Sequence, residues 1–482
     1  MLETFLIIRL SRIWETVIMS RDQALAAIED YYDSGSFEAQ LARRIHFKTE
    51  SNLPNCDGAL QAYLDDDIIP YLSDMGFTCN VYPNPRKDAG PFLVAQRFES
   101  DDLPTVMTYG HGDVVAGYDD QWDNKMSPWH ITKVGQRWYG RGTADNKGQH
   151  TINLAALKTV LDTRGKLGFN VTVLIEMGEE RGSPGLKDFC AAHKDLFDAD
   201  VFIASDGPRI QPENPTIFMG SRGVFNFTMR LDSHSGGHHS GNWGGLLTNP
   251  GVIMAHALAS MIDRNGKILV DGWRNTHIPN SVRDAIAKLE VGGGENTPEI
   301  NPNWGEPDMT VAERVFASNT FEVRAFETGN PKSPANAIPP SAIVFGHLRY
   351  VVGTDITQLM PLLRTHLDQN DFNDIKITSE RDPMHATRLD PNHPWAKWVV
   401  KSLEQTADGE ISVVPNLGGS LPNDVFADLL GLPTIWVPHS YAGCSQHAPN
   451  EHILESISQS ALRLMTGLWW DLGEGSTPKK AS

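Results

Sequence analysis

Short runs of β-branched and apolar residues alternate with helical patterns after about residue 100, and this alternation constrains the fold of the chain most. Strand patterns at 105–109, 171–175 and 201–204 are interspersed with a helical pattern at 152–161. Strands that alternate with helices form βαβ units, which build largely parallel sheets. The sequence therefore predicts an α/β domain whose mixed, mostly parallel sheet carries helices on both faces. Residues 20–100 show mainly helical spacing, so we expect helices there.

The pattern changes near Gly223 to the order β-α-β-β-α-β, which is that of a ferredoxin-like unit. Its strands are expected at 224–231, 321–326, 342–352 and 375–378, and its helices at 252–262 and 356–367. Strand–helix alternation returns after about residue 385. The sequence thus predicts one α/β domain that is interrupted by a smaller α+β domain.

Domain boundaries follow from these changes of pattern. We expect the α/β domain to comprise residues 19–218 and 385–482, and the inserted domain to comprise residues 219–384. Met19 is followed by a helical pattern, so we interpret residues 1–18 as an extension ahead of the natural start. A length of 482 residues, typical of about three domains, then divides into two.

Composition excludes several classes of function. The chain has 41 Lys and Arg against 60 Asp and Glu, a formal net charge of −19, whereas nucleic-acid backbones and anionic membranes need clustered positive charge. No apolar run approaches the roughly 20 residues that span a bilayer. Four scattered cysteines form neither a disulfide framework nor a thiolate metal site. With no basic leader in view, we expect a cytoplasmic protein without nucleic-acid or membrane partners.

Acidic residues and histidines stand just past the ends of the predicted strands. They are His111 and Asp113 after the first strand, Glu179 and Glu180 after the second, and Asp206 after the third; Asp145 lies in a glycine-rich segment before the helix. The carboxyl ends of strands in an open α/β sheet face one crevice, so these side chains can converge. Imidazoles with carboxylates suit a divalent metal such as zinc, manganese or cobalt, and a catalytic site keeps one position open for water.

Five blocks of sequence resemble, in order, the family of co-catalytic di-metal peptidases. The blocks are His111-Gly112-Asp113, residues 122–148, Gly178–Gly185, Asp206-Gly207 and Gln446–Glu451. That family contains carnosinase-type dipeptidases, aminoacylases, acetylornithine and succinyl-diaminopimelate deacylases, and glutamate carboxypeptidases. The resemblance spans nearly the whole chain and is strongest to the carnosinase-type branch. It implies a catalytic α/β domain and an inserted lid domain through which two subunits form a homodimer.

The resemblance implies two divalent metal ions per subunit, zinc first and manganese or cobalt as alternatives. Asp145 would bridge the ions, His111 and Asp206 would hold one, and Glu180 and His447 the other. Glu179 would be the general base on a metal-bridging hydroxide, and Asp113 would orient His111. A cis peptide bond would follow Asp145.

Residues of the lid and of a late glycine-rich segment would complete the site. The segment 232–245 contains three histidines; a His-Ser-Gly-x-x-Gly-Gly pattern selects His239 as the oxyanion-stabilising residue, often supplied by the partner subunit, whereas an Asp-x-His-Ser-Gly pattern selects His234. Asn336 and Arg349 would bind the substrate's carboxylate or the tetrahedral intermediate, and Gly419 and Ser420 would contact the bound dipeptide.

The implied reaction is hydrolysis of the amide bond of dipeptides or short peptides. The alternative within the family is an N-acyl or N-carbamoyl amino acid amidohydrolase, because the outer half of the amide is left open. Extra sequence at Gly236–His239 and Gly292–Asp308 could reshape the pocket. Two alternatives do not use a metal-dependent reaction. One is a cysteine hydrolase that uses Cys444 with His439 or His447, and the other is a non-catalytic peptide-binding paralogue.

Overall fold

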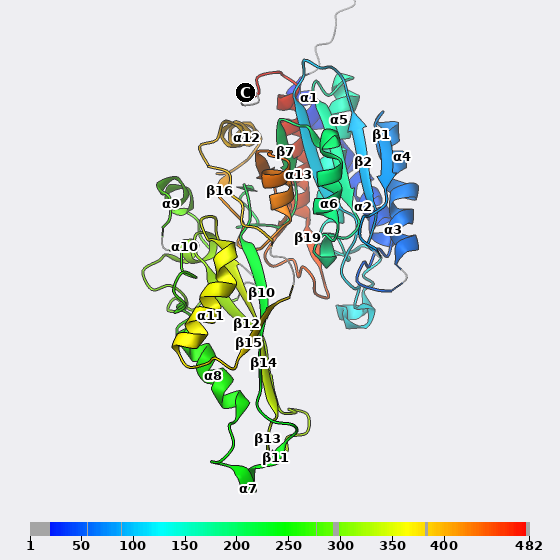
Figure 1. Ribbon diagram of the computed structural model, residues 1–482. Coiled ribbons are helices and arrows are strands. Elements are labelled where there is room, and N and C mark those ends of the chain that lie inside the picture. Colours follow the sequence, from blue (N-terminus) through cyan, green and yellow to red (C-terminus); the bar gives the residue numbers. More distant parts are fainter. Residues whose placement is uncertain are drawn as a thin grey trace, which may run out of the picture.

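The computed structural model describes residues 20–478, apart from residues 55, 88, 276, 293–297 and 381–383. The predicted extension at residues 1–18 lies outside the described residues. Figure 1 shows a layered α/β domain and, projecting from it, a narrower domain that ends in a small hairpin.

The α/β domain is built on an eight-stranded sheet in the order β1-β2-β6-β3-β7-β17-β9-β16. The strands are β1 (Thr78–Tyr82), β2 (Phe92–Arg97), β3 (Thr105–His111), β6 (Asn170–Glu176), β7 (Val201–Ala204), β9 (Thr216–Phe218), β16 (Ser412–Val414) and β17 (Thr434–Trp436). Strands β6, β3, β7 and β17 run parallel, as do β9 and β16, while β1 and β2 are antiparallel to their neighbours. The mixed, mostly parallel sheet is confirmed. The expectation of mainly helical structure before residue 100 did not include β1 and β2.

Side chains alternate between two hydrophobic cores, one on each face of the sheet. On β7, Val201 and Ile203 join one core while Phe202 and Ala204 join the other. Helices that cover the first face are α1 (Arg21–Asp33), α2 (Ser36–His46), α3 (Asp57–Tyr63), α4 (Ile69–Asp74), α5 (Lys147–Arg164), α12 (Pro394–Glu404) and α13 (Glu455–Leu472). The second face is covered by α6 (Leu186–Ala192), α9 (Asn280–Ile286) and α10 (Val311–Phe316). Helices α9 and α10, which lie inside the range expected for the lid, therefore pack on the eight-stranded sheet.

The lid has the predicted ferredoxin-like order. Its antiparallel sheet runs β12-β14-β10-β15, with β10 (Gly223–Asp232), β12 (Thr320–Thr328), β14 (Ser341–Tyr350) and β15 (Lys376–Ser379). Helices α8 (Pro250–Met261) and α11 (Leu359–Gln369) bury their apolar side chains against one face of this sheet. Pro361 is tolerated because it lies in the first turn of α11, where backbone N–H groups have no intrahelical acceptor.

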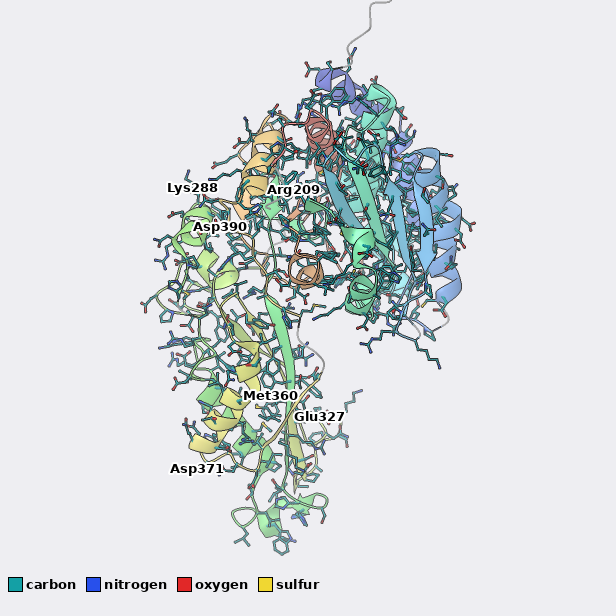
Figure 2. All side chains as sticks on the ribbon, turned by 45° about the horizontal axis from the view of Figure 1, so that its top comes forward. Arg209, Lys288, Glu327, Met360, Asp371 and Asp390 are labelled. Carbon is teal, nitrogen blue, oxygen red and sulfur yellow. The ribbon has the colours of Figure 1, made fainter. Side chains whose placement is uncertain are left out.

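The far end of the lid carries a small tip made of β11 (His238–His239), β13 (Ala337–Ile338) and α7 (Ser240–Trp243) (Figure 1). Figure 2 shows Met360 and Asp371 on the helix side of the lid and Glu327 on β12. Smaller sheets flank the main one: β4 (Thr132–Val134), β5 (Arg137–Tyr139) and β19 (His452–Leu454), and β8 (Pro208–Arg209) with β18 (Ser440–Tyr441). Among the residues described, no helix is long and apolar enough to cross a bilayer.

Candidate metal and catalytic site

One carboxylate, that of Asp145, lies between two imidazoles. Nε2 of His111 is 3.0 Å from its Oδ1, and Nε2 of His447 is 2.9 Å from its Oδ2. The side chain of Asp145 is 5% exposed and that of His111 is fully buried, whereas His447 is half exposed. Asp145 thus offers a separate oxygen to each histidine.

Each imidazole also faces a second carboxylate. Oδ2 of Asp206 lies 3.7 Å from Nε2 of His111, and Oε2 of Glu180 lies 3.0 Å from Nε2 of His447. Ligand atoms of His111, Asp145 and Glu180 all lie within 4.8 Å of one another. The five residues predicted as metal ligands are therefore gathered in two overlapping groups that share Asp145.

The topology explains why residues so far apart in the sequence meet. His111 is the last residue of β3, Glu179 and Glu180 lie in a short 3-10 helix, η4 (Glu179–Arg181), after β6, and Asp206 follows β7. Because β3, β6 and β7 are parallel neighbours, their carboxyl ends meet at one edge of the sheet. Asp145 stands just before α5, and the peptide bond from Asp145 to Asn146 is cis, as the resemblance implies.

Asp113 contacts His111, as expected of an orienting residue, chiefly through its main chain. Nδ1 of His111 lies 3.0 Å from the backbone carbonyl oxygen of Asp113 and 3.5 Å from its Oδ1. The Asp113 carboxylate instead accepts hydrogen bonds from the hydroxyl of Ser51 and from the backbone amides of Glu179 and Glu180. It therefore contacts His111 chiefly through the main chain and holds the Glu179–Glu180 loop through the side chain.

Burial and crowding of the carboxylates dominate the electrostatics. Burial raises the pKa of Glu180 to about 7 and that of Asp206 to about 6, and the negative charge of Asp145 adds to both shifts. Burial also raises the pKa of Glu179 well above its usual value. Burial would raise the pKa of Asp145 as well, but hydrogen bonds with His111 and His447 lower it. The site thus concentrates negative charge that a cation would stabilise.

This donor set fits a divalent cation. Two imidazole nitrogens and several carboxylate oxygens are the ligands that zinc, manganese and cobalt share. One ring nitrogen of His111 and one oxygen each of Asp145 and Glu180 lie within 4.8 Å of one another. His111 is oriented by the contact between its second ring nitrogen and the main chain of Asp113, which is the usual arrangement for a metal-ligating histidine.

A second group of predicted residues meets where the lid joins the catalytic domain. Nη1 of Arg349, on β14, donates to Oγ of Ser420 at 2.6 Å, and that hydroxyl donates to the carbonyl oxygen of Arg222, also at 2.6 Å. Arg222 in turn donates from Nε to the carbonyl oxygen of Gly418. The loop containing Gly419 and Ser420 is therefore tied to the lid strands beside Arg349.

His239 and Asn336 lie together at the tip, away from this junction. Ser240 donates its backbone N–H to the carbonyl oxygen of Asn336 at 2.9 Å, and Nδ1 of His239 accepts from the backbone N–H of Gly241 at 3.1 Å. Both residues are exposed. The tip that carries them lies at the far end of the lid (Figure 1). His234, the alternative, donates from Nε2 to the carbonyl oxygen of Thr248 at 2.7 Å.

Sequence reasoning assigned no role to two residues that contact the site. Gln446 donates from Nε2 to Oδ2 of Asp145, and the carboxylate of Glu451 accepts the backbone N–H of Asp145. Both belong to the Gln446–Glu451 block, so their closeness to His447 in the sequence was the signal that could have suggested a role at the site. Their partners lie about 300 residues away, which no local pattern reveals.

The cysteine-hydrolase alternative does not fit the structure. Cys444 is 1% exposed, and burial raises the pKa of its thiol to about 12, so the thiolate is disfavoured at neutral pH. His439 is fully buried and pairs through Nε2 with the hydroxyl of Ser205 at 2.9 Å. Neither residue is arranged for nucleophilic attack.

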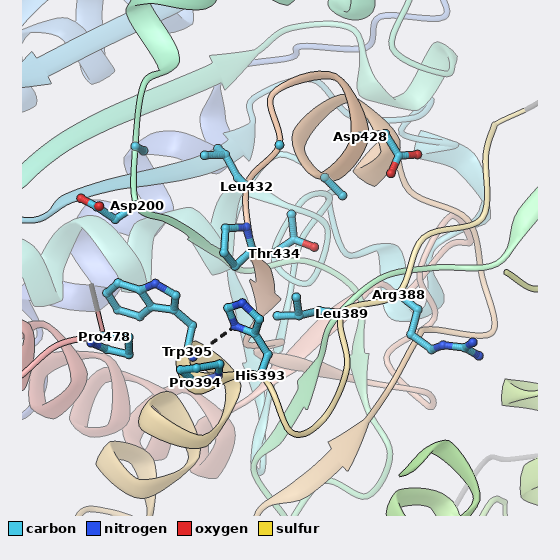
Figure 3. A pocket seen from close by; sticks show the side chains of 14 residues that line it. Asp200, Arg388, Leu389, His393, Pro394, Trp395, Asp428, Leu432, Thr434 and Pro478 are labelled. Carbon is cyan, nitrogen blue, oxygen red and sulfur yellow. Dashed lines mark hydrogen bonds between the residues drawn. The ribbon is translucent and has the colours of Figure 1, made fainter. Parts of the chain in front are cut away.

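A cavity of about 550 Å³ lies at the opposite edge of the sheet, where β7 and β17 begin (Figure 3). Its walls include Trp395, Leu432 and Pro478. Its histidine, His393, accepts the backbone N–H of Trp395 through Nδ1 and so caps α12. This cavity is separate from the carboxylate cluster.

Comparison with known proteins agrees with the site geometry. Residues 107–471 match the peptidase family M20/M25/M40. Because this match covers most of the chain, the protein belongs to that family; it is a metal-dependent peptidase, a hydrolase of amide bonds.

Individual relatives extend the similarity over most of the chain. The chain is 32% identical over 379 residues to the human Beta-Ala-His dipeptidase, and the match covers 75% of this chain and 74% of that protein. It is 26% identical over 363 residues to the cysteinylglycine-S-conjugate dipeptidase of Corynebacterium striatum, covering 73% and 76%. The fold resembles the solved structure of the dipeptidase Dug1p from Saccharomyces cerevisiae, with a TM-score of 0.76 and 20% identity, covering 95% of this chain and 99% of that chain.

Proposed function

We propose that this protein is a dipeptidase that hydrolyses the amide bond of dipeptides or short peptides. The reaction would use two divalent metal ions, for which zinc is the first candidate. The observation that carries the proposal is the position of Asp145, whose two oxygens face His111 and His447 separately. His111 and Asp206 would hold one ion, and Glu180 and His447 the other. Bound ions of this kind lower the pKa of water towards 7 and polarise a scissile carbonyl.

The remaining steps fall to side chains of the chain itself. Glu179 stands beside Glu180 in η4, where its carboxylate would take a proton from water and pass it to the leaving amine. Arg349 and Ser420, 2.6 Å apart, would bind the carboxylate of the substrate, and Gly419 would bring the main chain close to it.

A dipeptide is favoured as the substrate over an N-acyl or N-carbamoyl amino acid because the relatives named above are dipeptidases. Both classes of substrate present an amide beside a carboxylate, so the pair of Arg349 and Ser420 serves either one. The choice depends on the group on the amino side of the amide.

We further propose a homodimer formed through the lid. Within the same subunit, His239 and Asn336 lie at a tip remote from the metal ligands, so an oxyanion role for His239 requires the active site of a partner. The edge strand β12 supports this arrangement, because Val323 and Phe326 are each 42% exposed on it.

The four cysteines form no disulfide bonds, which favours the cytoplasm as the compartment.

The proposed function is tested by activity and metal content measured on one preparation. The metal-free protein is reconstituted with Zn²⁺, Mn²⁺ or Co²⁺, and each form is assayed against dipeptides and against N-acetyl and N-carbamoyl amino acids of matched carboxyl-terminal residue. We expect about two ions per subunit and faster hydrolysis of the dipeptides. Preference for the acylated substrates would establish the amidohydrolase instead, and a folded protein that binds no dication would establish a non-catalytic paralogue.

A further inference from the structure

The carboxylate of Glu451 lies at the centre of a loop of backbone amides. Its Oε1 accepts from the N–H groups of Gly142, Ala144 and Asp145 at 3.1, 2.9 and 3.0 Å. Its Oε2 accepts from Nη1 of Arg141 at 2.7 Å and from the N–H of Gly142 at 3.0 Å. Glu451 is 1% exposed, so this network operates away from water.

The loop that surrounds this carboxylate ends in the central residue of the metal site. Residues 140–145 wrap around one anion, and the last donor is the backbone N–H of Asp145 itself. The carbonyl oxygen of Glu451 also accepts from Gly140 at 3.0 Å, so both ends of the loop contact the same residue. The main-chain position of Asp145 is therefore fixed directly by Glu451.

Glu451 also ends the loop that carries the other half of the site. It stands four residues after His447, and the loop between them is tightly turned, with positive φ angles at Ser445, His447 and Asn450. The loop is closed by a hydrogen bond from the N–H of His452 to the carbonyl oxygen of Cys444 at 3.0 Å. One residue thus joins the main chain before α5 to the segment that presents His447.

We propose that Glu451 is a positioning residue that holds Asp145 in register with His447, so that metal affinity depends on it. The inference rests on the ligand roles proposed above for these two residues. Only a carboxylate meets the requirement, because both of its oxygens accept hydrogen bonds. An amide of the same shape would turn an N–H₂ group towards N–H donors at one of the two positions. Its negative charge is balanced by Arg141, which is fully buried beside it.

The test is the dissociation constant for Zn²⁺, measured by competition with a chromophoric chelator well below the melting temperature. Glu451→Gln is expected to weaken zinc binding by about 10–100-fold, as loss of residues that orient metal ligands usually does. Glu451→Asp keeps the negative charge but shortens the side chain by one methylene, which moves the carboxylate away from the amide donors. We therefore expect weaker zinc binding in this variant too. Glu313→Gln is the matched control: Glu313 is 8% exposed and accepts the backbone N–H of Thr310 at 2.8 Å in the cap of α10.

The variant Arg141→Met tests whether Glu451 contributes only to the stability of the fold and not to metal binding. This variant removes the ion pair and lowers the melting temperature but leaves the hydrogen bonds from the three backbone amides to Glu451 in place. We expect its zinc affinity to stay within about threefold of wild type. Wild-type affinity in both Glu451 variants, or an equal loss in Arg141→Met, would overturn the inference alone. Failure of the wild-type protein to bind zinc would overturn the proposed function with it.

Discussion

The carboxylate of Asp113 accepts the backbone N–H of Glu179 through a hydrogen bond of 3.1 Å. This contact joins the loop after β3 to the loop after β6, and a second bond from the N–H of Glu180 at 3.2 Å reinforces it. The side chain of Asp113, two residues after the proposed metal ligand His111, therefore determines where the main chain of Glu179 and Glu180 lies. Because this anchor acts on the main chain, the side chain of Glu179 can serve as the proposed base.

Glu179→Gln should separate catalysis from metal binding. Because Glu179 is not among the proposed ligands, the variant is expected to keep its metal while turnover falls by about 10²–10⁴-fold. Steady-state kinetics and metal analysis of the same sample measure the two effects. Glu404→Gln, at an exposed glutamate that ends α12, should behave like wild type. Near-normal turnover in Glu179→Gln would remove this residue from the role of base.

His239→Ala should abolish most activity if the tip serves a partner subunit. The loss of one oxyanion donor typically costs about 10²–10³ in kcat. Mixing inactive His239→Ala with inactive Glu179→Gln subunits, after exchange, should restore about a quarter of wild-type activity, because half of the dimers are mixed and each has one intact site. If His234→Ala is inactive and His239→Ala is active, the alternative histidine is the functional one.

Charge placed on the lid edge should dissociate the dimer. Phe326→Glu puts a carboxylate at an exposed apolar position of β12, where desolvation on pairing would be unfavourable. Analytical ultracentrifugation is expected to show monomers with little hydrolytic activity. Leu53→Glu, an equally exposed leucine on the catalytic domain, is the control and should remain dimeric. A dimeric Phe326→Glu variant would place the interface elsewhere.

Removal of metal should lower the melting temperature. A ligand that binds only the folded state adds about 2.7 kcal/mol of stability at one hundred times its dissociation constant. A chelator should reverse this gain and Zn²⁺ should restore it, as followed by scanning calorimetry. In Asp206→Asn, which retains the other ligands, the response to zinc should shrink. An identical response in this variant would argue against Asp206 as a ligand.

His347 on β14 should make the lid sensitive to acid. Burial and the nearby charges of Arg349, Arg324 and Arg222 lower its pKa to about 4. The unfolded chain, with a histidine pKa of about 6.5, binds a proton first, so this contribution to stability is complete above pH 6.5 and is lost as the pH falls towards 4. Urea unfolding should therefore show a smaller loss on acidification in His347→Asn. An NMR titration should place the pKa near 4, and Arg324→Gln should raise it.

Elements with strong local patterns were predictable from the sequence. The lid strands and helices, and the strands β3, β6 and β7, carry enough apolar periodicity to fix their type, and parallel neighbours then bring His111, Glu180 and Asp206 to one edge. Strand β1 was missed because it is half exposed, with Thr78 and Asn80 among its residues, and so lacks a buried stripe.

Tertiary contacts between distant segments were not predictable. The packing of α9 and α10 on the catalytic sheet depends on the apolar face formed by Phe202, Phe218 and Trp436, which exists only after the sheet is assembled. The acceptor role of Glu451 depends likewise on amides more than 300 residues earlier in the chain. Residue types could be recognised, but the partners were set by topology.

The place of β17 in the sheet has a consequence for synthesis on the ribosome. Residues 434–436 form a strand between β7 and β9, so the amino-terminal strands leave an unoccupied row of hydrogen-bonding groups until the last tenth of the chain emerges. The lid, whose strands and helices all precede residue 380, can form earlier. A nascent chain therefore carries a finished lid and an open sheet edge at the same time, and needs protection from aggregation at that stage.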